Sequence, residues 1–202
     1  MNLDNQNLEW KLCEAYFSIL EKNTSLQVSF EELAIAAKIS KEQVEKIVPK
    51  QSTDYRIFFL KILISKLDSD VLTELREDLV DDTISSTYDK ILEGLSLRFE
   101  KYIQYKPSLK ILSSNSKQKL EVFLNFFKEN FNFSFNLLTL IEKDQKCGIK
   151  TLKSLALNIV FTKSLEIFLK DENRDIDSVI RYLDKYLSDI EDLGLFLGII
   201  KK

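Results

Sequence analysis

The chain of 202 residues contains no histidine and only two cysteines. Without histidine it lacks the commonest general base and the commonest metal ligand. Cys13 and Cys147 stand far apart and form neither a CxxC pair nor a zinc-ligand spacing. We therefore expect both to be free, buried thiols in a reducing cytoplasm. We also expect no enzyme activity, no cofactor and no metal site, because no nucleophile has a histidine base to activate it.

Glycine, proline and long apolar runs are scarce as well. Four glycines and two prolines leave long helices uninterrupted and disfavour β-hairpins. No apolar run approaches the ~20 residues of a membrane-spanning helix. The opening residues MNLDNQNLEW contain acidic side chains and lack the apolar core of a secretion signal. The net charge of −3 gives no electrostatic indication of nucleic-acid binding, although it is compatible with an acidic repressor. We expect a cytoplasmic protein.

Apolar residues recur at helical spacing along the whole chain, which predicts an all-α fold. The pattern predicts a helix over residues 5–22, two short helices within 29–48 and a long helix over 53–79. Further helices are predicted over 83–105, over a phenylalanine-rich segment that ends near 142, and over 149–170 and 175–193. We expect residues 1–52 to form a helix-turn-helix domain and residues 53–202 to form a larger helical body.

The stretch 29–52, SFEELAIAAKISKEQVEKIVPKQS, is the most informative part of the chain. Ser29 is followed three residues later by Glu32, and Ser40 is followed by Gln43. Each pair predicts a capping box, in which the serine oxygen accepts a backbone N–H and the longer side chain reaches back to the cap. Pro49 ends the second helix. Two short helices joined by a tight turn predict a helix-turn-helix, a motif that binds DNA.

The pair Ala36-Ala37, the run Ile39-Ser40-Lys41, Val44 and the turn Pro49-Lys50 resemble the motif of the TetR family of helical regulators. In that family the first three helices bind DNA, a fourth leads to a ligand-binding body, and the last two form a four-helix bundle with a second subunit. The resemblance implies a TetR-like fold and a ligand-responsive, DNA-binding transcriptional regulator. The residues that it places against DNA are Ser40, Lys41, Gln43, Lys46 and Lys50.

The same segment departs from the family pattern. Lys38 stands where the family usually has glycine, and a left-handed conformation there would strain it by about 1 kcal/mol. Gln43 replaces a hydroxyl residue, Glu45 replaces a tyrosine, and Ile47-Val48 replace an aromatic pair. Residues 1–52 contain six lysines and eight acidic residues, a net charge of −2. Neutralisation of phosphates supplies most non-specific DNA affinity, so that contribution is weak here.

A second family with this fold is also similar: the lipid-binding ubiquinone-biosynthesis proteins, whose helix-turn-helix no longer serves DNA. The similar stretches run from YDKI (88–91) through RFE (98–100) to Pro107, and over YLDKYLSDI (182–190). The tryptophan-rich motifs of that family are absent, since Trp10 is the only tryptophan. This resemblance implies a lipid- or quinone-binding protein that does not bind DNA. A purely structural interaction module is a third alternative.

The helical body contains large apolar residues that could surround a small apolar ligand or form ordinary core. We expect a pocket between the helix over 83–105 and the phenylalanine-rich helix. Its predicted lining is Leu95, Phe99, Tyr102, Phe123, Phe127 and Leu138. Candidate polar groups of this pocket are Tyr102, Asn125, Asn132 and Asn136.

The last two helices, residues 151–193, predict a homodimer. The first is apolar on nearly every face, so one face is available to a second copy, unless the helix is buried in a monomer. The second has one apolar stripe, formed by Ile176, Val179, Ile180, Leu183, Leu187 and Ile190. The tail LGLFLGIIKK (193–202) begins with eight residues that lack a polar side chain. It could pack on its own body, complete the dimer or contact a membrane surface.

Overall fold

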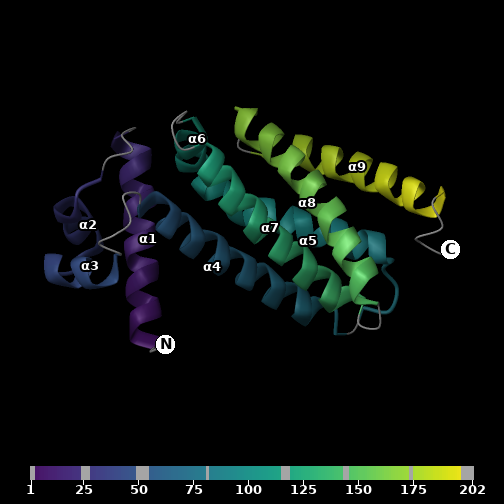
Figure 1. Cartoon of the computed structure of the whole chain (residues 1–202), viewed down its shortest axis with the longest axis horizontal. Helices are drawn as coiled ribbons and strands as arrows, with labels where there is room; N and C mark the ends of the chain where they lie inside the picture. Colours follow the sequence, from purple (N-terminus) through teal and green to yellow (C-terminus); the bar gives the residue numbers. More distant parts are fainter. Residues whose placement is uncertain are drawn as a thin grey trace. The chain divides into compact units, whose positions relative to one another are not determined.

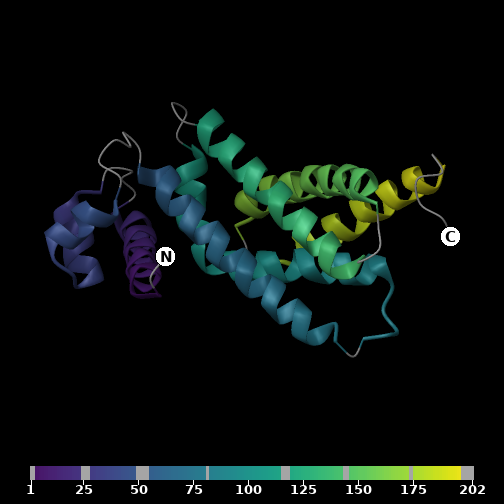
Figure 2. The ribbon, with the colours of Figure 1, turned by 60° about the horizontal axis from the view of Figure 1, so that its bottom comes forward.

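The computed structural model describes residues 3–23, 28–48, 55–80, 82–114, 119–142, 146–172 and 175–196. These residues form helices and no strand (Figures 1 and 2), which confirms the all-α prediction. In chain order the elements are α1 (Leu3–Asn23), α2 (Phe30–Ala37), α3 (Lys41–Ile47), α4 (Tyr55–Asp78), α5 (Thr87–Tyr102), the short 3-10 helix η1 (Ile103–Tyr105), α6 (Lys106–Ser114), α7 (Lys119–Ile141), α8 (Cys147–Lys170) and α9 (Asp177–Phe196). None of the described helices is both long and apolar enough to cross a membrane.

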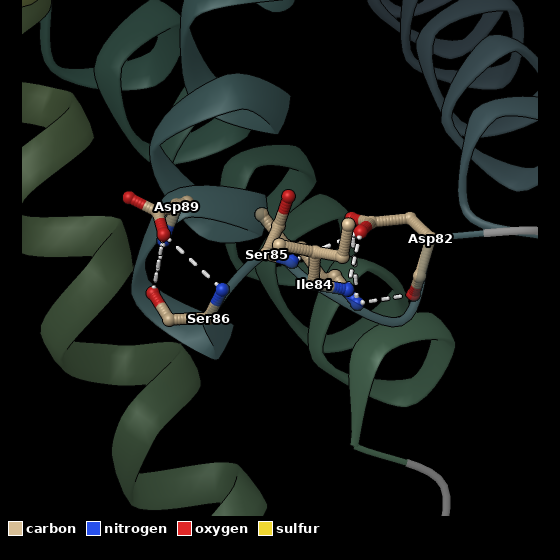
Figure 3. Close-up of polar contacts among 6 residues, drawn as sticks. Asp82, Ile84, Ser85, Ser86 and Asp89 are labelled. Carbon is tan, nitrogen blue, oxygen red and sulfur yellow. Dashed lines mark hydrogen bonds and ion pairs between the residues drawn. The ribbon is translucent and has the colours of Figure 1, made fainter.

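The start of α5 differs from the prediction over residues 83–105, because local hydrogen bonds hold residues 82–86 outside the helix (Figure 3). A carboxylate oxygen of Asp82 accepts the backbone N–H groups of Ile84 at 3.0 Å and Ser85 at 2.9 Å. These N–H groups lower the pKa of the Asp82 carboxyl to about 2. Ser86 then forms a capping box with Asp89, so the helix begins at Thr87.

The chain divides into two compact units. One comprises Met1–Lys66 with Tyr105–Phe126, and the other comprises Leu67–Gln104 with Phe127–Lys202. The divisions fall inside α4, η1 and α7, so each of these helices contributes to both units. The boundary predicted at residue 52 lies within the first of these units and stays a prediction.

A shared core explains why the first unit extends beyond residue 52. The ring of Tyr16 in α1 stacks on Phe59 in α4, with 4.7 Å between centroids. The neighbouring Phe17 contacts Tyr105 edge to face, and its carbonyl accepts the hydroxyl of Ser108 in α6 at 2.8 Å. Part of the apolar surface of α1 is thus buried against α4 and α6.

The two cysteines differ in their surroundings. Cys13 is buried in α1 and its Sγ donates to the carbonyl of Phe59 at 3.4 Å. Burial raises the pKa of this thiol well above its usual range. Cys147 is exposed at the start of α8, so the expectation of two buried thiols is wrong for this residue. Both are free.

In the second unit, α9 packs on α8 and α5. Close approach of α5 to its other neighbours depends on Gly94. A Cβ atom at this position would lie 2.8 Å from Cδ1 of Leu137 in α7 and 3.0 Å from Cδ1 of Leu75 in α4. A larger residue would therefore require the Leu137 and Leu75 side chains to move.

An ion pair lies inside the second unit. The guanidinium of Arg98 in α5 is fully buried and binds Asp68 in α4 through two bonds, Nε to Oδ1 at 2.6 Å and Nη2 to Oδ2 at 2.8 Å. Burial raises the pKa of the Asp68 carboxyl from its ordinary 3.8 to about 6, although the guanidinium acts in the opposite direction. Desolvation therefore outweighs the attraction for the carboxylate, as is common for buried ion pairs.

We expect the two partners of this pair to be unequally sensitive to substitution. Asp68→Leu should lower the free energy of unfolding by about 3–5 kcal/mol, because it leaves a buried guanidinium that cannot lose its proton. Arg98→Met should cost less at pH 5 than at pH 7.5, because the remaining carboxyl takes up a proton. In the wild type, the raised pKa means that the contribution of Asp68 to stability is complete below about pH 4 and is lost as the pH rises through about 6. Removing the guanidinium, which lowers this pKa, raises the pKa further, so the variant loses more stability than the wild type as the pH rises from 5 to 7.5. Urea denaturation at both pH values measures these losses, and equal losses for both variants at both pH values would contradict this expectation.

Candidate nucleic-acid interface

The two predicted capping boxes are present at the starts of α2 and α3. The N–H of Ser29 donates to Oε2 of Glu32 at 2.7 Å, and the N–H of Glu32 donates to Oγ of Ser29 at 3.2 Å. The N–H of Ser40 donates to Oε1 of Gln43 at 3.0 Å, and the N–H of Gln43 donates to Oγ of Ser40 at 3.3 Å. The backbone and hydroxyl of Ser29 lower the pKa of Glu32. Each short helix is thus started by its own local sequence.

The turn between the helices contains Lys38 in the left-handed conformation, with φ 54° and ψ 47°. Its N–H donates to the carbonyl of Ile35 at 3.2 Å, and the next N–H, of Ile39, donates to Ala34 at 3.0 Å. These bonds close the end of α2 in the manner usually provided by glycine. The lysine Cβ makes this conformation unfavourable by about 1 kcal/mol.

Apolar contacts hold α2 and α3 in place within the first unit. Leu33, Ala37 and Val44 are buried, as is Val48 at the end of α3. Tyr55 at the start of α4 hydrogen-bonds through its hydroxyl to both the N–H and the carbonyl of Val28. This packing turns the buried face of α3 inward and leaves its opposite face to solvent.

The exposed face of α3 contains most of the predicted DNA contacts. Ser40, Lys41, Gln43 and Lys46 are all exposed, and Lys50 lies outside the described residues. The Lys41 ammonium forms an ion pair with Glu31 of α2. This hydrogen bond lowers the pKa of Glu31 and raises that of Lys41. One of the cations expected at phosphates is thus paired inside the motif.

Two further features weaken the face as an anion-binding surface. Gln43 uses its Oε1 in the capping box, so the side chain expected to read a base already has a structural bond. Glu42 is exposed and Glu45 is half-buried on the same short helix. The exposed face of α3 therefore has little net positive charge.

The predicted ligand-lining residues fall into different surroundings. Leu95, Phe99, Tyr102 and Leu138 are buried in the second unit. Phe127 is half-buried, and Phe123 is 45% exposed in the part of α7 that belongs to the first unit. The buried rings meet α8: Phe99 stacks on Phe161 at 4.6 Å and lies 5.2 Å from Phe168. Sequence reasoning missed these two α8 rings as neighbours.

The candidate polar groups are not the ones found in the interior. Asn136 and Asn132 are exposed, the latter donating to Glu129 at 3.2 Å, and Asn125 is half-buried. The buried asparagines are Asn130 and Asn158. The sequence contained a signal that Asn130 is buried, because this residue precedes the buried residues Phe133, Ser134 and Leu137 at helical spacing.

The apolar stripe predicted on α9 is largely covered by its own chain. Ile176, Val179, Leu183 and Leu187 are buried, since α9 packs on α8 and α5. Among the described side chains of this helix pair, the exposed large apolar residues lie on α8. They are Leu152, Leu155 and Ile159, which are 50%, 41% and 51% exposed. The side chains of the C-terminal tail lie outside the described residues.

No protein-family model matches the chain, and no curated protein sequence matches it. Across the described ranges, no group of three or more cysteine or acidic side chains is arranged to hold a metal ion.

Replacement of Lys38 by glycine should stabilise the protein. We expect Lys38→Gly to raise the free energy of unfolding by about 0.5–1 kcal/mol, because the left-handed conformation has no steric cost without a Cβ atom. Lys38→Ala is the matched control: it removes the same long side chain but keeps the Cβ atom. Urea denaturation of the three proteins measures the difference, and equal stability of the glycine and alanine variants would show that the turn is not strained.

Proposed function

We propose that this protein is a TetR-like, ligand-responsive transcriptional regulator that binds DNA as a cytoplasmic homodimer and has no catalytic activity. The observation that carries the proposal is the capped helix pair α2–α3. Its second helix is buried on one face and exposes Ser40, Lys41, Gln43 and Lys46 on the other. A short helix exposed in this way, after a first helix that packs behind it, is what insertion into a major groove requires.

Each exposed side chain has a separate role in this proposal. Ser40 and Lys50 hold phosphates, and Lys41 and Lys46 supply positive charge next to them. Gln43 reads a base, since an amide can pair with both polar atoms of adenine. Reading by both atoms requires its Oε1 to exchange the bond to the N–H of Ser40 for a bond to the base.

The dimer in this proposal uses the exposed face of α8. Leu152, Leu155 and Ile159 follow one another at helical spacing, so two copies can cover each other's apolar side chains. Two subunits on DNA then present two copies of α3, which must lie about 34–36 Å apart to enter successive major grooves. The effector in this proposal is a small apolar molecule bound among the large apolar residues around Phe99 and Leu138.

A lipid- or quinone-binding protein with a degenerate helix pair is the second candidate. The observation that favours it is the charge of the motif, where Lys41 is paired with Glu31 and acidic residues share α3. A protein that has lost DNA binding has no need of phosphate contacts, so such pairing would be neutral for its function.

Salt-dependent DNA titration distinguishes the two candidates. In the regulator, Lys46→Ala should weaken binding uniformly across sequences and reduce the salt slope by about one unit. Glu31→Gln should strengthen binding a few-fold, because it frees Lys41 for a phosphate and removes a negative charge. Glu21→Gln on α1 is the control for the charge change alone. Absence of any salt-dependent affinity of the wild-type protein for duplexes from its own genome would favour the second candidate.

A charge on the exposed face of α8 should separate the subunits. We expect Ile159→Glu to convert the dimer to folded monomers, because the side chain is half-exposed in one chain and becomes buried between two. Thr139→Glu, on the exposed side of α7, is the control and should leave the dimer intact. Light scattering and circular dichroism at micromolar concentration measure mass and helix content. A wild-type monomer would rule the dimer out.

Charge at the adjacent Val160, which is buried within its own chain, should instead unfold the body.

A further inference from the structure

A chain of polar contacts crosses the interior of the second unit, with one member on each of four helices. Asp68 of α4 binds Arg98 of α5, whose Nη1 donates to Oδ1 of Asn130 in α7. Nδ2 of Asn130 in turn donates to the side-chain and backbone oxygens of Asn158 in α8. Nδ2 of Asn158 donates to the carbonyl of Phe127 at 3.0 Å. We call Asp68, Arg98, Asn130 and Asn158 the buried polar chain.

Three members of the buried polar chain have no contact with solvent, and neighbouring groups hold their side chains in place. Arg98, Asn130 and Asn158 are 0% exposed. The guanidinium carbon lies 4.3 Å and 4.2 Å from the ring centroids of Phe133 in α7 and Phe161 in α8. Hydrogen bonds and ring contacts from two helices thus orient the guanidinium on α5.

Within the second unit, α4 makes contacts of two kinds, apolar and polar. Leu67, Val71 and Leu75 are buried on one face of α4, and such apolar contacts have no preferred direction. They resist separation of the helices more strongly than they resist a small rotation or slide. The two bonds between Asp68 and the planar guanidinium fork do have a direction, so they fix both the rotation and the axial position of α4.

A contribution to stability does not explain why this ion pair is present. The carboxylate is desolvated, and buried pairs of this kind are often matched or exceeded in stability by apolar residues of similar volume. A contact that contributes little to stability can still exclude alternative packings, because each of them would leave a buried charge without its partner.

We infer that the buried polar chain sets the rotation and axial register of α4 against α5, α7 and α8, and that apolar packing alone leaves more than one register open. This role goes beyond the proposed function and does not depend on it.

The test replaces the ion pair by apolar residues in the full chain. We expect Asp68→Leu/Arg98→Met to keep the helix content and the unfolding midpoint of the wild type, or to raise the midpoint. The backbone amide signals of residues 67–78 in NMR spectra should nevertheless double or broaden, and their hydrogen exchange should accelerate at least tenfold. The control is Glu74→Gln/Lys101→Met. It removes the partly exposed ion pair at 2.7 Å between the same two helices and should leave single, sharp signals.

A second variant tests the register without removing the charges. Asp68→Glu keeps the ion pair but lengthens the acidic side chain by one methylene, so the signals of residues 67–78 should shift and remain single. Single, unshifted signals in both variants would overturn the inference, because apolar packing would then suffice to position α4. Unfolding of the Asp68→Leu/Arg98→Met protein would overturn it as well, since the pair would then be a source of stability. Equal broadening in the Glu74→Gln/Lys101→Met control would show that the effect is not specific to the buried polar chain.

Discussion

A guanidinium without access to water is the constraint on which the second compact unit depends. Arg98 is fully buried, and its charge and N–H donors must be satisfied by protein groups. Asp68 supplies a charged acceptor from α4, and Asn130 supplies a neutral acceptor from α7. Because Asn130 is itself oriented by Asn158 of α8, one side chain on α5 restricts the positions of three other helices. The absence of a Cβ atom at Gly94 leaves room on α5 for the side chains of Leu137 and Leu75.

Features decided by neighbours along the chain could be predicted from the sequence. The capping boxes at Ser29 and Ser40 each join residues three apart, so their geometry depends little on the rest of the fold. Lys38, in the left-handed conformation, ends α2 two residues before the cap Ser40. The same rule, applied to Ser86 and Asp89, gives the observed start of α5. The predicted start at residue 83 was wrong because a local signal was overlooked and not because tertiary packing overrode it.

Features decided by distant residues could not be predicted in this way. Arg98 lies 30 residues from Asp68 and 32 from Asn130 in sequence, and no spacing rule connects them. A polar residue in a helical pattern is usually exposed, and helical spacing that places Asn130 on a buried face does not identify its partners. The apolar helix α8 has the same limitation. Its composition predicts that more than one face is covered, but only the packing of α9 shows that Leu152, Leu155 and Ile159 remain exposed.

In the candidate interface, the fold of the helix pair and the charge on its surface come from different residues. The helix pair is built by caps, a turn and a few buried aliphatic residues, none of which requires DNA. Affinity for DNA would come from the exposed side chains of α3, where Lys41 and Lys46 are accompanied by Glu42 and Glu45. The ion pair between Lys41 and Glu31 is exposed, and such pairs are weak, so a phosphate can compete for the lysine. The glutamates of α3 cannot be displaced in this way. They remain beside the phosphates in any complex, so they limit non-specific affinity more than the ion pair does, and recognition would have to depend on base contacts.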